Sequence, residues 1–277
     1  MALLNWLRRT NPRNGRVVCE DGLTHNIGDS DRGGQMEIAR GNKPGARPFM
    51  AFGERVAIEG ETRQPVLPVG DDVNIAPPSA GVTIESNSAD DAAGGLGVQE
   101  VRLVYLRQDL SEQSKTIPLD GTNPVSIADS EFRFAQCTHV NAWGANGPVA
   151  AGDITVSDSS GNVYSVIQAG EVRCTSSYRM IPAGKVLYVD SAVSSSVSGT
   201  SATSSQFQVA ASEIFGIQYV DPLAFFPFLA IGVQDNGVPL NFPPRGPFQA
   251  GTVVGALYSS DKEATVTASW YGRLEDA

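Results

Sequence analysis

The chain has 277 residues, and its 30 acidic against 20 basic side chains give a formal net charge of −10. Contacts with nucleic-acid phosphates need lysine and arginine, so this balance argues against nucleic acid as a partner. The 29 glycines and 17 prolines, with only 18% charged residues, are typical of short strands joined by many turns. The most apolar window, residues 221–233, is interrupted by Pro222 and Pro227 and is too short to span a bilayer, so we expect no membrane partner.

The first 70 residues show no sustained hydrophobic periodicity, because Gly, Pro, Asn or Asp interrupts them every few positions. The first 55 residues carry nine Lys or Arg against six acids, whereas the rest of the chain is strongly acidic. A basic segment with scattered apolar anchors suits docking on an acidic partner, although compositional drift would also produce this difference. We therefore expect an extended, mostly irregular anchoring arm over residues 1–70. Its predicted partner-binding residues are Trp6, Arg8, Arg9, Arg13 and Arg16.

From Gly81 onward, alternation of apolar and polar residues predicts β-strands throughout. In residues 98–106 the side chains of Val101, Leu103 and Tyr105 share one face, and a polar turn separates this strand from its predicted hairpin partner. The predicted strands are residues 81–86, 98–106, 112–119, 131–143, 154–158, 163–167, 172–181, 185–196, 204–220, 228–233, 251–260 and 264–274.

Many short strands separated by regular turn signals are typical of a β-sandwich or jelly roll. The strand–helix alternation of a parallel α/β sheet is missing from the sequence. The sequence therefore predicts an all-β protein with an antiparallel β-sandwich or jelly-roll body over residues 71–277, preceded by the arm over residues 1–70.

Side chains that perform chemistry are sparse in this chain. There are two histidines, His25 and His139, and the common nucleophile-elbow, P-loop and zinc-protease motifs do not occur. Cys137 and His139 lie two residues apart and would share one face of a strand, but zinc needs about four ligands and no second Cys/His cluster follows. We expect these two to be ordinary sheet residues.

Paired acids occur at Asp29 and Asp31, at Asp71 and Asp72, and at Asp90 and Asp91. Such pairs can hold calcium or hydrolyse glycosides, but acids beside glycines are more often solvated turn residues. We predict no catalytic residue, no metal site and no cofactor, and hence that the chain is not an enzyme.

The three cysteines, Cys19, Cys137 and Cys174, are odd in number and far apart, which argues against a disulfide framework. Buried thiols in a protein that assembles in a reducing cytosol fit this pattern. A bridge between Cys137 and Cys174 stays open.

Two Pro-rich segments near the C-terminus concentrate aromatic residues: Phe225, Phe226, Phe228, Phe242 and Phe248. Because proline fixes the backbone, these rings could form a rigid patch at a subunit interface, and we predict partner contacts for Phe225, Phe226 and Phe228. The alternative is that they seal one end of the core. Elsewhere, Trp143 or Tyr164 could stack on a sugar ring if exposed, or Trp143 could cap the core.

Several stretches form a recognisable set: "SNSADDAAGGLGVQEVRLVYLRQDLSEQSKTIPLDGTNPV" from Ser86, then "AGDITV", "VYSVIQAGE", "YRMIPAGKVLYV" and "ATVTASWYGRLED". An acid–glycine cluster leads into a hairpin that ends in a G-T-x-P-V turn, an IPAG turn precedes a strand, and the last strand carries an aromatic residue. Together they resemble a family of tailed-bacteriophage virion structural proteins. The resemblance covers about Ser86 to Ala277 and leaves residues 1–70 outside.

This resemblance implies a non-enzymatic, β-rich component of the virion that is assembled in the bacterial cytoplasm. We expect a capsid decoration (cement) or head-fibre protein that docks through its arm, forms a homotrimer, and contacts other virion proteins such as the major capsid or the tail and neck proteins. The alternative is a tail or neck adaptor, or a fibre protein, with a carbohydrate-binding β-sandwich that recognises a receptor. A polysaccharide-degrading spike enzyme is the weakest candidate, because it needs two carboxylates about 5–10 Å apart in a cleft.

Overall fold

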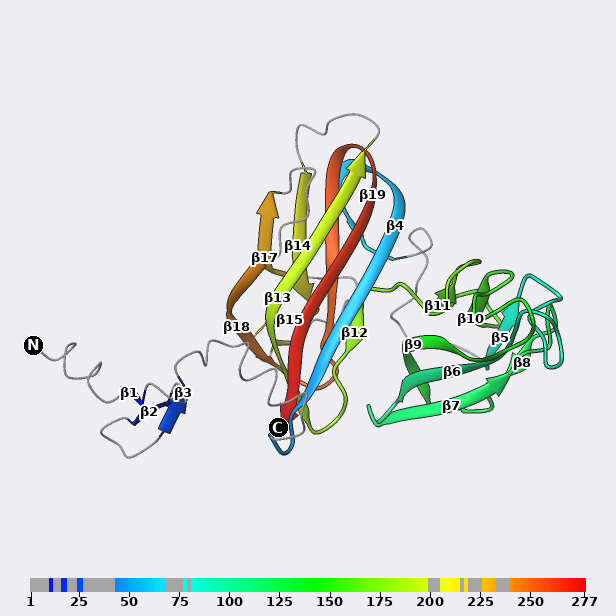
Figure 1. Ribbon diagram of the computed structural model, residues 1–277, viewed down its shortest axis with the longest axis horizontal. Helices are drawn as coiled ribbons and strands as arrows, with labels where there is room; N and C mark the ends of the chain where they lie inside the picture. The colour runs from blue at the N-terminus through cyan, green and yellow to red at the C-terminus, as the bar shows by residue number, and fades with distance from the viewer. Residues whose placement is uncertain are drawn as a thin grey trace, which may run out of the picture.

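The computed structural model describes residues 10–11, 16–18, 24–26, 43–67, 77–78, 81–198, 205–214, 217–218, 226–232 and 240–277. Within these ranges all regular structure is β-strand, and every strand pairing is antiparallel (Figure 1). The predicted all-β antiparallel fold is therefore confirmed. This part of the chain contains no helix that is long and apolar enough to cross a membrane.

The larger sandwich, here called the body, consists of residues 43–67 and 174–277. Its strands are β4 (Arg47–Pro65), β12 (Arg179–Met180), β13 (Lys185–Ser198), β14 (Ser205–Ala211), β17 (Phe226–Gly232), β18 (Leu240–Phe248) and β19 (Val253–Asp276). The order of the main sheet is β17-β14-β19-β13-β18, with β4 and β12 also paired to β19. Two short strands, β15 (Glu213–Ile214) and β16 (Ile217–Gln218), pair with each other.

The long strand β19 belongs to both layers of the body. Its first half pairs with β14 and its second half with β13, while β4 follows it in register from Pro65 opposite Leu257 to Arg47 opposite Leu274. The register shifts around Ser260 and Ala264, where Figure 1 shows both β19 and β4 turning over at one end of the body. This two-stranded ribbon therefore folds onto itself, as in a jelly roll, and closes the sandwich at that end.

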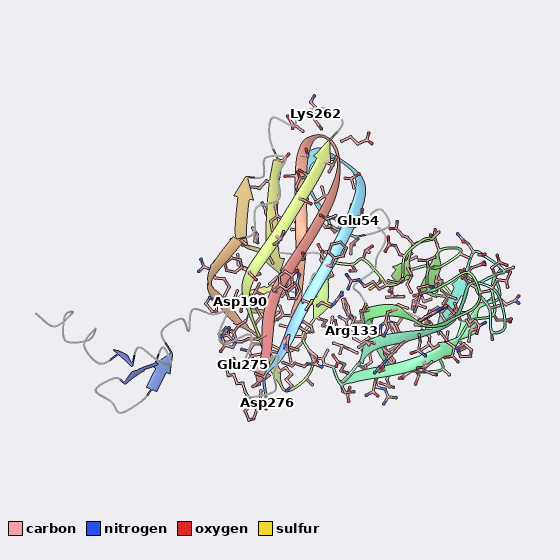
Figure 2. All side chains as sticks on the ribbon, viewed as in Figure 1. Glu54, Arg133, Asp190, Lys262, Glu275 and Asp276 are labelled. Atoms are coloured by element: carbon pink, nitrogen blue, oxygen red, sulfur yellow. The ribbon has the colours of Figure 1, made fainter. Side chains whose placement is uncertain are left out.

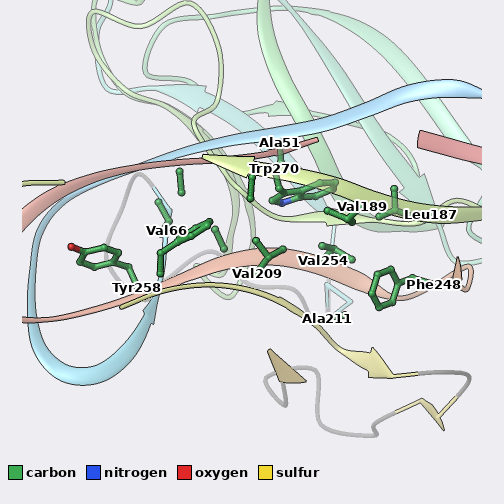
Figure 3. Packing of buried hydrophobic residues seen from close by; sticks show 14 of the residues in the cluster. Ala51, Val66, Leu187, Val189, Val209, Ala211, Phe248, Val254, Tyr258 and Trp270 are labelled. Atoms are coloured by element: carbon green, nitrogen blue, oxygen red, sulfur yellow. The ribbon is translucent and has the colours of Figure 1, made fainter. Parts of the chain in front are cut away.

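The core of the body lies between the two halves of this ribbon. Figure 3 shows Trp270, Val189 and Leu187 on one side, facing Val209 and Val254 on the other. Trp270 is fully buried, and its ring centroid lies 5.9 Å from that of Phe49 on β4. Burial of such a large side chain is a main source of stability for a sandwich of this size.

A second sandwich, here called the inserted sandwich, occupies residues 81–173, between β4 and β12. Its strands are β5 (Val82–Ser86), β6 (Val98–Arg107), β7 (Glu112–Pro118), β8 (Val125–Ser126), β9 (Phe132–Trp143), β10 (Ile154–Asp158) and β11 (Val163–Ile167). They form two sheets, β11-β10-β5-β8 and β7-β6-β9. The residues buried between these sheets form one cluster, in which Phe132 stacks on Tyr105 with 5.2 Å between ring centroids and meets Tyr164 edge-on at 5.7 Å.

The two sandwiches are joined by a side-chain cluster and by specific hydrogen bonds. Leu106 and Phe134 of the inserted sandwich pack with Tyr178 and Met180 of the body. The amide of Gln136 pairs with the backbone of Met180, accepting from its N–H at 3.1 Å and donating to its carbonyl. The end of the inserted sandwich that contacts the body is therefore the end at which β6 finishes and β9 begins.

Ser177 lies where the chain re-enters the body, and its side chain is fully buried. Its hydroxyl donates to the carbonyl of Val66 at 2.8 Å and accepts from the N–H of Ala256 at 3.2 Å. Its own carbonyl accepts the indole N–H of Trp270 at 2.8 Å. One residue therefore connects the end of β4 with both halves of β19. Gly53 on β4 permits this approach, because a Cβ there would lie 2.7 Å from the N of Ser177.

The predicted boundary between arm and body at residue 70 is wrong, because β4 is an integral strand of the body. Beyond Phe49, its core-facing residues Ala51, Gly53 and Arg55 are small or charged, and the more apolar Met50 and Phe52 point outward. Because most of the buried positions are the less apolar ones, and because Gly and Pro interrupt the segment, its sequence does not predict a strand. The arm hypothesis is therefore restricted to residues before β4.

Residues before Lys43 are described only in three short strands, β1 (Thr10–Asn11), β2 (Arg16–Val18) and β3 (Thr24–Asn26). These three pair with one another in the order β1-β2-β3. The next described stretch begins at Lys43, whose Nζ lies 2.5 Å from Glu275 Oε1 of β19; Arg273 of the same strand contacts that oxygen at 2.8 Å. Figure 2 shows Glu275 and Asp276 at the end of the body where β4 begins.

Other strand predictions also need correction: residues 204–220 contain β14, β15 and β16 instead of one strand, and residues 251–260 and 264–274 belong to the one strand β19. The predicted strand over residues 172–181 is reduced to β12, because Cys174 to Tyr178 make irregular contacts with both sandwiches. Strand β18 was not predicted, since its prolines and glycine break the pattern. Proline is tolerated there because β18 is the last strand of its sheet and pairs with β13 alone, with shifts in register.

We predict that deletion of residues 1–42 leaves the body intact, whereas deletion of residues 1–66 destroys it. The second deletion removes β4 from both layers and takes Phe49 away from Trp270. Urea unfolding followed by tryptophan fluorescence should show a single cooperative transition near the full-length midpoint for the shorter deletion, and no cooperative transition for the longer one. An unchanged transition in the longer deletion would show that β4 is not required for the fold.

Candidate functional site

Asp91, in the acid–glycine cluster, is a structural residue. Its carboxylate is fully buried and accepts four hydrogen bonds. Oδ1 accepts from the N–H of Val98 at 2.8 Å and of Ala151 at 3.1 Å, and Oδ2 accepts from the N–H of Gly152 at 2.9 Å and from the hydroxyl of Ser86 at 2.8 Å. Because both oxygens are occupied by protein donors, Asp91 holds loops 87–97 and 143–152 together and presents no carboxylate to a ligand.

These two loops, here called the tip loops, expose an unusual concentration of apolar side chains. Leu96 is 54% exposed, Trp143 51% and Val149 40%. The loops lie side by side, since Gly144 N–H donates to the carbonyl of Gly97 at 2.7 Å and Asn146 N–H to that of Leu96 at 2.8 Å. Single exposed apolar residues are ordinary, but a group on adjoining loops is typical of a contact surface.

Trp143 ends β9, next to a polar outer face of the sheet β7-β6-β9. His139 lies opposite Arg102 on that face, but the register shifts between Glu100 and Val101, where Asn141 is the extra residue of β9. Alternation therefore does not carry on to Trp143, which is paired with the core residue Val98 and is nevertheless exposed. Asn141 Nδ2 donates to Glu100 Oε2 on the neighbouring strand at 3.1 Å. Burial, and then the positive charge of Arg102, lower the pKa of His139, so its imidazole is uncharged near neutral pH. The outer face therefore offers an amide, a carboxylate and a neutral imidazole, and Trp143 is exposed beyond them at the end of β9.

Trp143 lies at the end of the inserted sandwich that is farthest from the body. Strand β6 begins at Val98, opposite Trp143, and runs to Leu106 and Arg107 beside the body. A strand of this length spans about 30 Å, at roughly 3.3 Å per residue. The tip loops are therefore held well away from the body, as Figure 1 shows for this end of β6 and β7.

Tyr164, the other residue considered as a sugar-stacking platform, is only 3% exposed, so that prediction is wrong. Its hydroxyl donates to Asp158 Oδ2 at 2.9 Å. Burial raises the pKa of Asp158, but hydrogen bonds from Asn162, Tyr164 and the N–H of Ser160 lower it more, to about 2. Tyr164 therefore packs in the core and stabilises a tight turn. Trp143 stays as the candidate residue for stacking on a sugar ring.

Most of the predicted partner-binding residues cannot be located. Trp6, Arg8, Arg9, Arg13 and Phe225 lie outside the described residues, and Arg16 in β2 and Phe226 in β17 have no described side chain. Phe228 is half-buried, and its ring centroid lies 4.8 Å from that of Phe248 in the body core. At this position the core-sealing alternative accounts for the contacts seen, and a partner contact stays a prediction.

The acid pairs and cysteines form no evident metal site in the part of the chain that the structure describes. No group of three or more His, Cys, Asp or Glu side chains there could hold a metal ion. Asp29, Asp31, Asp71, Asp72, His25 and Cys19 lie outside this description or have no described side chain.

Comparisons with known proteins add little to this geometry. No protein-family model and no curated protein matches the chain. A solved structure, described as "Structure of infectious bursal disease virus Gx strain", is 9% identical; the match covers 84% of this chain and 71% of that chain, with a TM-score of 0.20. A likeness at that TM-score carries no argument about fold or function.

We predict that Asp91→Ala lowers the free energy of unfolding by about 3 kcal/mol or more, because three backbone N–H groups and one hydroxyl lose a charged acceptor. Urea denaturation of the full chain measures this loss. Asp90→Ala is the matched control, since the neighbouring Asp90 is exposed, and it should change stability by less than about 0.5 kcal/mol. Equal effects of the two substitutions would contradict the assigned role of Asp91.

Proposed function

We propose that this chain is a non-enzymatic structural protein of a tailed-bacteriophage particle, of the capsid-decoration or head-fibre kind. One support is the resemblance described above, whose stretches include elements of both sandwiches. The acid–glycine cluster contains Asp91, which fixes the tip loops, and "ATVTASWYGRLED" is the second half of β19 with the core residue Trp270. The resemblance therefore rests on segments that determine the fold, and fold alone does not assign a function.

The observation that carries the proposal is the nested arrangement of the two sandwiches. The inserted sandwich contacts the body at one end of β6 and β9 and exposes an apolar surface at the other end. This arrangement suits a protein that joins particle components or binds a host surface, because the body can self-associate while the inserted sandwich projects from it. The body is proposed to form a homotrimer, and the virion is the proposed location.

Attachment is proposed to involve the segment before β4. Most of the excess of basic residues in the first 55 positions precedes β4, including Arg8, Arg9 and Arg13. The ion pair of Lys43 with Glu275 lies where this segment joins the body. A basic segment that starts at this point could bind an acidic groove on a neighbouring capsid, tail or neck protein.

A second candidate function is carbohydrate binding at the tip, as in a fibre or adaptor that recognises a receptor. It is favoured by the exposure of Trp143, two positions along β9 from Asn141, which is hydrogen-bonded to Glu100. An indole ring can stack on the apolar face of a sugar, while the amide and carboxylate can bind its hydroxyl groups. Both functions are compatible with one particle protein.

We predict that the chain is a stoichiometric component of purified particles of the phage whose genome encodes it, detectable by mass spectrometry. In solution, mass photometry should give a trimer both for the full chain and for residues 43–277, because the body is proposed to self-associate without the preceding segment. Only the full chain should bind purified capsids or tails of that phage.

Absence of the chain from intact particles would overturn the proposed function. A monomer in both forms would overturn the trimeric body while leaving the particle location to be judged by mass spectrometry. Equal capsid or tail binding by both forms would show that residues 1–42 are not the attachment segment.

For the carbohydrate alternative, we predict that Trp143→Ala weakens binding to an array of bacterial lipopolysaccharide O-antigens and capsular polysaccharides by about tenfold or more, the effect of losing an aromatic anchor. Tyr271→Ala, which truncates an exposed aromatic residue on the body, is the matched control and should leave binding unchanged. Failure of the unaltered chain to bind any glycan, or equal binding by both variants, would exclude this alternative.

A further inference from the structure

Two cysteines from separate parts of the chain meet at the junction between the sandwiches. Cys137 lies in β9, and Cys174 lies in the segment that returns the chain to the body. Their Sγ atoms are 3.1 Å apart and share a hydrogen bond. Both are free thiols; Cys174 is buried and Cys137 is partly exposed.

The return segment is held against β9 in a fixed register around these thiols. Cys174 N–H donates to the carbonyl of Thr138 at 2.8 Å, and Val140 N–H donates to the carbonyl of Val172 at 2.9 Å. Next to Cys137, the Gln136 amide is paired with the backbone of Met180 in the body. The two backbone segments that carry the sulfur atoms are therefore held side by side.

We propose that Cys137 and Cys174 are a redox-active pair that forms an intramolecular disulfide, which fastens the return segment to β9 and stiffens the junction. In a reducing compartment the pair stays as two thiols, and an oxidising compartment favours the bond. The oxidant we consider is a small-molecule disulfide such as oxidised glutathione.

The chemistry proceeds in two exchange steps. The Cys174 thiolate accepts the proton of the partly exposed Cys137 across their hydrogen bond, and the Cys137 thiolate attacks the small disulfide. A mixed disulfide forms, and the small thiolate that is released takes the proton back from Cys174. The Cys174 thiolate then attacks the Cys137 sulfur, the protein disulfide forms and the second small thiolate leaves. The two protons given up by the cysteines end on the two small thiols, so the protein loses two electrons and the small disulfide gains them.

The surroundings assign different roles to the two sulfur atoms. Hydrogen bonding with Cys137, and the nearby Arg179 guanidinium, lower the pKa of Cys174, which favours its thiolate. Hydrogen bonding with Cys174 and burial raise the pKa of Cys137. Cys174 is thus suited to be the resolving nucleophile, and the more accessible Cys137 to be the first sulfur that an oxidant meets.

The effect of the bond is to close the 38-residue ring formed by residues 137–174. Such a cross-link restricts the unfolded chain and so favours the folded state. The ring contains β10 and β11, and its closure lies beside the contacts that join the inserted sandwich to the body. Oxidation should therefore stabilise both the inserted sandwich and its junction with the body.

The test uses the full chain equilibrated in buffers of reduced and oxidised glutathione, then alkylated, digested and mapped by mass spectrometry. We expect the Cys137 and Cys174 peptides to become linked, with the loss of two hydrogens, while Cys19 stays alkylated. A second measurement compares urea unfolding of the oxidised and reduced protein, and we expect the oxidised midpoint to lie at higher urea and to return on treatment with dithiothreitol.

Matched variants separate the proposed pair from other thiol chemistry. Cys174→Ala should stop at a glutathione adduct on Cys137 and show no rise in the urea midpoint, and Cys19→Ser should behave as the unaltered chain. The proposal is overturned if Cys137 and Cys174 both stay alkylated, if Cys19 takes part in the bond, or if the bond forms without raising the midpoint. None of these outcomes depends on whether the chain is found in phage particles.

Discussion

The whole architecture depends on the position of Ser177, because that residue occupies the point at which two folded-over strands and an inserted domain meet. The hydroxyl and carbonyl of Ser177 bind Val66, Ala256 and Trp270, which come from the end of β4 and from the two halves of β19. A buried backbone group without a partner would cost more than its hydrogen bond contributes, so these contacts are mutually required. The folded ribbon can close only if the chain returns from the inserted sandwich at this place.

The position of Ser177 also explains how a domain of about 90 residues can be inserted without disturbing the body. The chain leaves after β4 near Leu67 and returns at Cys174 to Ser177, and the two passages are joined by the Ser177 N–H, which donates to the carbonyl of Val66 at 3.3 Å. The Gln136 amide and the packing of Leu106 and Phe134 then fix how the inserted sandwich sits on the body. Because β6 and β9 run from this junction to the tip loops, the junction sets where the tip loops lie relative to the body.

The sequence was informative where each strand buries alternate residues, and it failed where the buried face is not the apolar one. The hairpin β6–β7 was predicted within two residues, since Val101, Leu103 and Tyr105 supply its core. Strand β4 was missed because Gly53 and Arg55 face inward while Met50 is exposed. Gly53 is required by the approach of Ser177, 124 positions later in the chain. The pattern of apolar and polar residues within one strand cannot reveal a constraint that comes from a residue so far along the chain.

The candidate site illustrates the same limit at the level of single residues. Trp143 and Tyr164 are both aromatic residues in predicted strands of the same sandwich, and the sequence does not show which of the two side chains is exposed. They differ because Asp158 lies within reach of the Tyr164 hydroxyl, whereas the residues that follow Trp143 turn away into a glycine-rich loop. A buried tyrosine needs a polar partner for its hydroxyl, so the presence of Asp158 permits burial of Tyr164. Trp143 lies beyond the last core residue of β9 and stays exposed, which makes its ring available to a ligand or a neighbouring protein.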